Sequence, residues 1–228
     1  MRQILGVFRL GVAAIVLVVG ALLILLAGLW PVRVRGCRLA AWIVVGLART
    51  FNRLFNIQVI CAAPEKLRTH HGLIFPNHLS YLDVLTLMSI MPVRFLSMAA
   101  VRQYPVIGWI AEVIGTVFVV REDENSRQQA RIAIVERFAK EPDPPIVLFP
   151  EGKLGPGHQL LPFRHGAFAI ASEHGIAFLP CVLRYTPLRI AAWHNGNLLA
   201  PLWQLAQFPG PLQVEILPLD VQHPQRTA

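Results

Sequence analysis

The chain begins with an apolar run, Leu10–Trp30, of twenty-one residues without a charge. As an α-helix, a run of this length is about 31 Å long, which matches the hydrocarbon thickness of a bilayer. A cleaved signal peptide is the alternative, but the run is too long for one and no A-x-A cleavage site follows it. The pattern therefore predicts a retained membrane helix.

A second apolar stretch, Leu39–Ala48, is too short to span a bilayer before Arg49 interrupts it. Continued to Cys61, it has the pattern of an amphipathic helix that lies in the membrane interface, with its arginines reaching the headgroups. A helix packed against the globular domain is the alternative. We expect residues 1–60 to form membrane-anchoring helices and residues 61–228 to form one globular domain.

From residue 61 onward, short β-type runs alternate with helical ones, which predicts an α/β fold with a sheet layered with helices. Several of the β-type runs are apolar throughout, as buried strands are. The expected strands are 72–75, 94–97, 116–120, 146–149, 176–182 and 212–217. The expected helices are 81–90, 106–113, 126–140 and 166–173.

Composition supports a membrane-bound protein. Hydrophobic residues make up 54% of the 228 positions, charged residues only 15%, and the mean hydropathy is +0.51. Soluble domains carry about 25% charged residues, so this chain is too apolar to be wholly soluble or disordered. The three cysteines are scattered, which indicates a reducing compartment and neither a disulfide framework nor a metal site.

Positive charge is concentrated at the N-terminal end. The formal net charge is +8, and residues 1–60 hold seven arginines and no acidic residue. This excess flanks the apolar run, so the expected partner is an anionic membrane surface and not nucleic acid. Arginines are more numerous after the run than before it, which favours a cytoplasmic location for the C-terminal domain.

The most informative polar stretch is Asn77–Asp83, which directly follows an expected buried strand. His78 is placed where α/β folds present ligands, and histidine is suited to proton abstraction near neutral pH. A carboxylate on its other ring nitrogen would fix the tautomer, and Asp83 can supply it if His78 lies in a loop and Asp83 in the first helical turn. Alternatively, Ser80 and Asp83 form only a capping box.

Three further stretches contribute to the pattern. Gly115–Arg121 presents an arginine that could bind an anion, or that is merely solvated at a strand end. Phe149–Lys153 contains Gly152, which allows close backbone approach to a ligand, or makes a simple turn. Leu179–Val182 alone would be a strand with a proline.

In this order the four stretches resemble the blocks of the 1-acylglycerol-3-phosphate O-acyltransferase family, N-H-x4-D, G-x-x-F-x-x-R, F-P-E-G-T-R-S and a short apolar block centred on proline. The first two blocks are complete. The third keeps Phe149–Gly152 but has Lys153, Leu154 and Gly155 where the family has Thr, Arg and Ser. The resemblance covers about residues 72–183.

The resemblance implies a glycerolipid-acyltransferase-like mixed sheet and a membrane-bound enzyme without a cofactor or metal. The implied reaction moves a fatty acyl group from acyl-CoA or acyl carrier protein to a lysolipid hydroxyl, with 1-acylglycerol-3-phosphate as acceptor and phosphatidate as product. His78 would deprotonate the hydroxyl and Asp83 would orient His78. The implied substrate-binding residues are Asn77, Arg121, Glu151, Gly152 and Lys153, with Arg121 on the phosphate.

Leu154 weakens the assignment of the acceptor, because leucine cannot replace an arginine that binds a phosphate. Lyso-ornithine lipid or another lysophospholipid is therefore an alternative acceptor. A catalytically silent lipid-binding or scaffold protein is the alternative outside enzymes, and the retained His78 and Asp83 argue against it.

Overall fold

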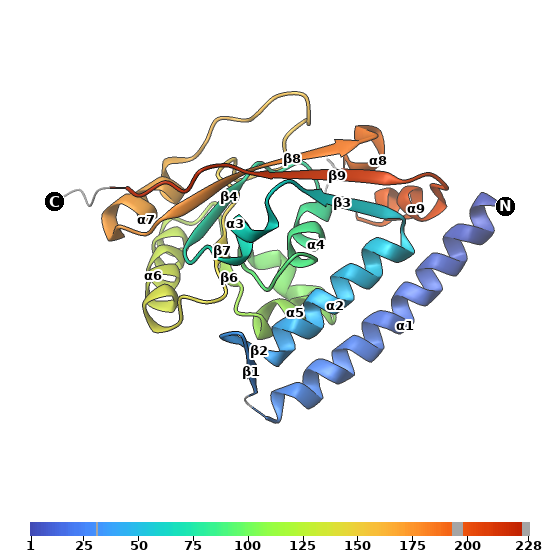
Figure 1. Cartoon of the computed structure of the whole chain (residues 1–228), viewed down its shortest axis with the longest axis horizontal. Helices are drawn as coiled ribbons and strands as arrows, with labels where there is room; N and C mark the ends of the chain where they lie inside the picture. Colours follow the sequence, from blue (N-terminus) through green and yellow to red (C-terminus); the bar gives the residue numbers. More distant parts are fainter. Residues whose placement is uncertain (31, 193–197, 225–228) are drawn as a thin grey trace.

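The computed structural model describes residues 1–30, 32–192 and 198–224, and a seven-stranded sheet runs through it (Figure 1). The strand order is β3-β9-β8-β4-β7-β5-β6. The strands are β3 (Ile57–Cys61), β4 (Leu73–Pro76), β5 (Arg94–Met98), β6 (Val117–Val119), β7 (Ile146–Val147), β8 (Phe178–Thr186) and β9 (Leu212–Pro218).

The sheet is mixed, as expected. Neighbouring strands are parallel except for β8 and β9, which pair antiparallel. Five strands, β8, β4, β7, β5 and β6, therefore run in one direction, and their carboxyl ends lie along the same edge of the sheet. In an α/β fold this edge is where ligands bind.

Helices cover both faces of the sheet. Along β4, Ile74 belongs to one apolar cluster, and Leu73 and Phe75 belong to the other, because successive side chains point to opposite faces. The helices are α1 (Arg2–Gly28), α2 (Leu39–Leu54), α3 (Pro64–Arg68), α4 (Leu82–Met88), α5 (Ile107–Val113), α6 (Glu124–Lys140), α7 (His165–His174), α8 (Leu188–Ala191) and α9 (Leu199–Gln207). A 3-10 helix (η1, Ala99–Gln103) and a small hairpin of β1 (Arg33–Val34) and β2 (Cys37–Arg38) complete the elements.

The N-terminal helix α1 is longer than the expected Leu10–Trp30 helix, since it begins at Arg2. The charge on Arg9 suggested a later start, but this side chain is buried and donates from Nη1 to the carbonyls of Ala206 and Phe208, at 3.2 and 2.7 Å. Within the described ranges, α1 is the one helix long and apolar enough to cross a membrane.

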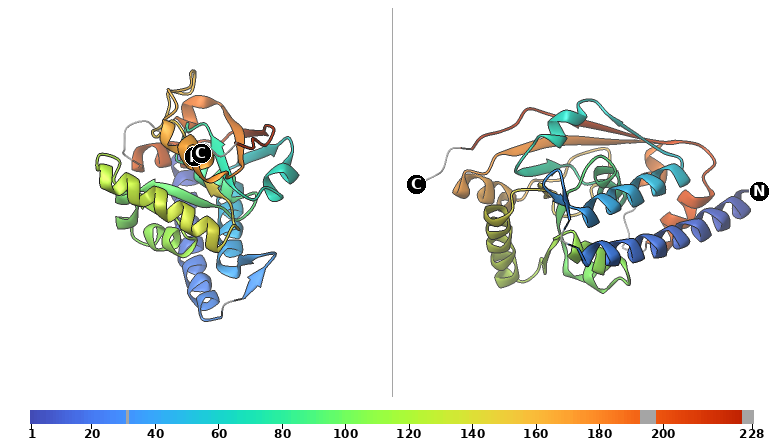
Figure 2. Two further views of the ribbon diagram at one scale, coloured as in Figure 1. Left: turned by 90° about the vertical axis from the view of Figure 1, so that its left-hand side faces the viewer. Right: turned by 60° about the horizontal axis from the view of Figure 1, so that its bottom comes forward.

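Helix α1 lies alongside α2 and contacts α9, as Figure 1 and the right-hand view of Figure 2 show. Gly20 packs so closely on α2 that an added methyl group would overlap the side chain of Leu47. Much of the remaining surface of α1 consists of exposed leucine, isoleucine and valine side chains.

The expected helix over Leu39–Cys61 is wrong in its last part. Helix α2 ends at Leu54, Asn56 adopts a positive φ of 55°, and Ile57–Cys61 is the edge strand β3. Helix α2 packs against α1 and α4, as the packed alternative expects, and its place in the membrane interface stays a prediction. The exposed Arg49 donates to the carbonyls of Ser89 and Ile90.

Most other predictions for residues 61–228 are confirmed within a few residues, although β7 has only two residues where four were expected. Strand β3 straddles the domain boundary expected at residue 60, and that boundary stays a prediction. Helices α3, α8 and α9 were not predicted as helices.

Candidate active site

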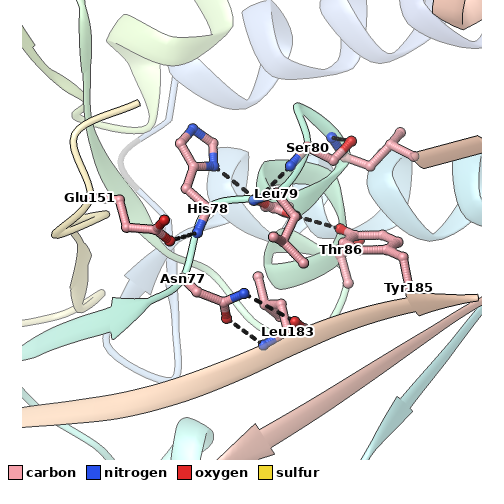
Figure 3. A network of polar contacts seen from close by, with 10 residues as sticks. Asn77, His78, Leu79, Ser80, Thr86, Glu151, Leu183 and Tyr185 are labelled. Carbon is pink, nitrogen blue, oxygen red and sulfur yellow. Dashed lines mark hydrogen bonds and ion pairs between the residues drawn. The ribbon is translucent and has the colours of Figure 1, made fainter. Parts of the chain in front are cut away.

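The Asn77–Asp83 segment leaves the carboxyl end of β4 and turns into α4 at the edge shared with β7 and β8 (Figure 3). His78 lies in the turn and Asp83 in the first turn of α4, as the spacing requires. The Nδ1 atom of His78 and Oδ2 of Asp83 are 2.8 Å apart. The structure thus brings together the two residues predicted to be catalytic.

Both carboxylate oxygens of Asp83 are occupied, and its side chain is fully buried. Besides the His78 ring, Oδ2 accepts from the backbone amides of Leu79 and Ser80, at 2.8 and 3.0 Å. Oδ1 accepts from the hydroxyl of Tyr185 at 2.6 Å. Asp83 therefore orients His78 and also holds the backbone of the turn that precedes α4, whose N-cap Tyr81 makes no side-chain capping bond.

Tyr185 lies on β8, far from this turn in sequence, and was not predicted as a site residue. Burial, and then the neighbouring charge of Asp83, raises the pKa of Tyr185 well above its ordinary value. The hydroxyl therefore stays protonated and donates to the carboxylate. Burial alternates along β8, and Leu183 and Tyr185 both lie on its buried side, beyond the expected end of this strand at residue 182.

Further contacts hold both the ring and the backbone of His78. Its ring stacks on Phe149 with centroids 3.8 Å apart. Its backbone N–H donates to Oε1 of Glu151 at 2.8 Å, and its carbonyl accepts from Gly155 N–H at 2.7 Å. Since Asp83 occupies Nδ1, the Nε2 lone pair of the neutral ring is available to accept a proton.

Glu151 is a buried positioning residue in this arrangement. Oε2 accepts from the backbone of Leu161 at 2.8 Å while Oε1 holds His78. A Cβ atom at Gly155 would lie 2.9 Å from Oε2, so the adjoining loop can approach this carboxylate only as glycine. Contact of Glu151 with substrate stays a prediction.

Asn77 continues the sheet beyond the end of β4. Its side-chain amide donates to the carbonyl of Leu183 at 3.1 Å and accepts from the Leu183 N–H at 2.7 Å (Figure 3). These two bonds fix the start of the turn to β8. Substrate contact by Asn77 likewise stays a prediction.

The remaining predicted binding residues are Gly152, Arg121 and Lys153. Gly152 has a φ of 70°, and a Cβ atom there would lie 2.5 Å from Nε of Arg164, so this guanidinium covers the glycine. Arg121 follows β6 and is half-buried, and burial, followed by the charge of Arg164, lowers its pKa. Lys153 is exposed. Their contacts with substrate stay predictions.

Across the described parts of the chain, no group of three or more His, Cys, Asp or Glu side chains could hold a metal ion. Cys37, Cys61 and Cys181 are all free thiols, and burial raises the pKa of the Cys181 thiol to about 12. None of the three contacts His78 or Asp83 by a hydrogen bond in these ranges.

Comparisons with known proteins agree with this geometry. A family model described as Acyltransferase matches residues 58–184. A lyso-ornithine lipid O-acyltransferase of Pseudomonas aeruginosa is 31% identical over 168 residues, 66% of this chain and 63% of that protein. A 1-acyl-sn-glycerol-3-phosphate acyltransferase of Neisseria meningitidis is 26% identical over 172 residues, 66% of this chain and 67% of that protein.

The crystal structure of the 1-acyl-sn-glycerophosphate (LPA) acyltransferase PlsC from Thermotoga maritima has a similar fold. It superposes with a TM-score of 0.76 at 17% identity, covering 98% of this chain and 88% of that chain. In sequence, the chain spans less than two thirds of the length of the Pseudomonas relative.

Proposed function

This chain belongs to the acyltransferase family, and from that premise we propose that it transfers a fatty acyl group from a thioester to the hydroxyl of a lysolipid. The observation that carries the proposal is the bond between His78 and Asp83, buried at the carboxyl edge of the sheet. The acceptor that we favour is 1-acylglycerol-3-phosphate, which would give phosphatidate. The donor would be acyl-CoA or acyl carrier protein.

The proposed reaction uses His78 as general base. Nε2 takes the proton of the acceptor hydroxyl, and the oxygen attacks the thioester carbonyl carbon directly. As the tetrahedral intermediate collapses, the carbon–sulfur bond breaks and the departing thiolate takes the proton from His78. Asp83 stabilises the imidazolium between these steps. The reaction requires neither an acyl-enzyme nor a resident cofactor.

A different acceptor is the second candidate. Leu154 cannot donate a hydrogen bond to a phosphate, and one relative is named a lyso-ornithine lipid O-acyltransferase. A catalytically silent lipid-binding protein is disfavoured. The carboxylate of Asp83, which binds the buried His78, accepts hydrogen bonds from three further donors, and lipid binding alone does not require such an oriented histidine.

We further propose that the protein works at the membrane surface with its catalytic domain on the cytoplasmic side. The apolar surface of α1 and the arginines that follow it support this location. A lysolipid acceptor could then enter the site without leaving the lipid phase.

The test is acyl transfer by the purified protein, assayed with labelled acyl-CoA or acyl carrier protein against a panel of lysolipids. His78→Ala should lower turnover by about 10²- to 10⁴-fold, as expected for loss of a general base. His174→Ala, at the exposed end of α7, is the matched control and should keep normal turnover. Near-normal turnover of a folded His78→Ala protein would refute this mechanism.

A further inference from the structure

The connection between β8 and β9 carries no formal charge over most of its length. Residues 190–214 include no Asp, Glu, Lys or Arg, although such residues make up 15% of the chain. Connections of this kind run over the surface of a domain, where polar and charged side chains are the rule. An uncharged surface segment of this length is suited to an apolar partner.

Helix α9 lies within this connection and exposes apolar side chains. One side of the helix is buried against the domain, whereas Leu199 is 77% exposed and Trp203 is 36% exposed. These two residues are four positions apart, so they share one stripe of the helix. The other exposed side chains of α9, Ala200 and Gln204, are uncharged as well.

Helix α9 lies beside the N-terminal part of α1, as Figure 1 and the right-hand view of Figure 2 show. A Cβ atom at Gly6 would lie 2.9 Å from the ring of Trp203 and 2.9 Å from Cγ of Gln207, so the two helices are in close contact there. In the same turns of α1, the side chains of Ile4 and Phe8 are exposed. The apolar surface of α1, the candidate membrane helix, therefore continues onto α9.

The position of Arg9 makes this surface compatible with lipid. Arg9 is the one charged residue between Arg2 and Arg33. Its side chain is buried, and Nη1 donates to the carbonyls of Ala206 and Phe208 at the carboxyl end of α9. Cations at membrane depth pair with backbone carbonyls in this way, and a helix end in lipid needs donors for the carbonyls that water would otherwise satisfy. The bond thus fits an α9 that lies at the depth of α1.

We propose that α9 is a second membrane-binding element, which inserts the stripe of Leu199 and Trp203 among the acyl chains of the bilayer next to α1. Because this surface is uncharged, its attachment does not depend on anionic headgroups, unlike that of the arginines after α1. Tryptophan is suited to the boundary between hydrocarbon and headgroups. The inference rests on the membrane location proposed above and adds an element to it.

The experiment measures tryptophan emission of the full-length protein in phosphatidylcholine vesicles that contain acyl chains brominated near the headgroup. The emission of Trp203 is the difference between the wild type and Trp203→Phe. It should be quenched by the brominated lipid, protected from iodide in the water phase, and unchanged at high salt. Leu199→Trp, which adds a reporter without removing Trp203, should show the same response.

Two further added tryptophans serve as matched controls. Phe8→Trp, at an exposed position of α1, should be quenched by the brominated lipid. Ile132→Trp, at an exposed position of α6 on the other face of the sheet, should respond to iodide and not to the brominated lipid.

Quenching of Phe8→Trp without quenching of either reporter on α9 would overturn the inference. Trp203 emission that is shielded from both quenchers, and that iodide reaches once the protein is diluted in the vesicles, would show that α9 packs against a second copy, and would overturn it too. If Phe8→Trp also escapes the brominated lipid, the proposed membrane location fails and the inference fails with it.

An acyl-transfer assay in the same vesicles, supplied with a thioester donor and a lysolipid, separates this inference from the proposed reaction. If brominated lipid quenches the reporters on α9 but no acyl group is transferred, the membrane-binding element stands and the proposed reaction fails. If acyl groups are transferred while both reporters respond only to iodide, the reaction stands and this inference fails.

Discussion

At the residue scale, Tyr185 offers a test of the buried network. Tyr185→Phe keeps the ring but removes the donor to Asp83, so the free energy of unfolding should fall by about 1.5–3 kcal/mol. Turnover should fall too, because the carboxylate that orients His78 loses one of its hydrogen bonds. Thr86→Val, which removes only the longer 3.5 Å contact to the same hydroxyl, should have a smaller effect on turnover.

Tyr185→Phe should also change how the free energy of unfolding depends on pH in alkaline solution. The pKa of Tyr185 is raised in the folded protein, whereas an unfolded tyrosine ionises near pH 10. Above about pH 10 the unfolded state therefore binds fewer protons, and the wild type loses stability as the pH rises. Denaturation at several pH values should show a shallower alkaline loss for Tyr185→Phe. Equal slopes would contradict the buried, protonated hydroxyl.

The sequence predicted the pair His78 and Asp83 better than it predicted the groups that hydrogen-bond to this turn. His78 and Asp83 are five positions apart, so a loop followed by one helical turn is enough to join them. Tyr185 is separated from Asp83 by 102 positions, and only the pairing of β4 with β8 brings it near. Asn77 and Glu151 were recognised by their motifs, but their backbone partners depend on tertiary structure.

At the element scale, two glycines on α1 make a matched pair. Gly20 packs against Leu47 of α2, whereas Gly11 has open space around it. Alanine is favoured over glycine in a helix by about 1 kcal/mol, so Gly11→Ala should stabilise the protein. Gly20→Ala should be about 1–3 kcal/mol less stable than Gly11→Ala, because Leu47 has to move. Thermal denaturation in detergent measures both, and equal stabilities would mean that α1 is not packed on α2.

The predicted helices and strands agree with the structure where the sequence marks the boundaries between them clearly. The central strands are short apolar runs with helical segments between them, and this alternation can be recognised without tertiary structure. At Leu54–Ile57 the apolar pattern continues from α2 into β3 with neither Gly nor Pro between them. Asn56 provides the break through its left-handed conformation, which asparagine tolerates and sequence alone signals weakly.

At the scale of the whole molecule, the N-terminal helix and the arginines after it contribute separately to membrane binding. Removing residues 1–28 should reduce association with anionic vesicles without abolishing it. Arg33 pairs with Glu141 and Arg49 binds backbone carbonyls, so the exposed Arg35, Arg38 and Arg53 should carry the remaining attraction.

High salt should weaken this residual binding, because charges at the headgroups are screened over about 8 Å at physiological ionic strength. Vesicle sedimentation across a salt series measures it. A truncated protein that binds equally at all salt concentrations would instead be held by apolar surface that α1 covers in the intact chain.

The double role of Asp83 has a consequence for the dynamics of the protein. The oxygen that orients His78 also receives the amides of Leu79 and Ser80, so a local opening at the start of α4 breaks all three bonds together. Such openings need less free energy than global unfolding. On warming, the protein should therefore lose its competent histidine before it loses its sheet, and hydrogen exchange at the amides of Leu79 and Ser80 would report how often the base is misaligned.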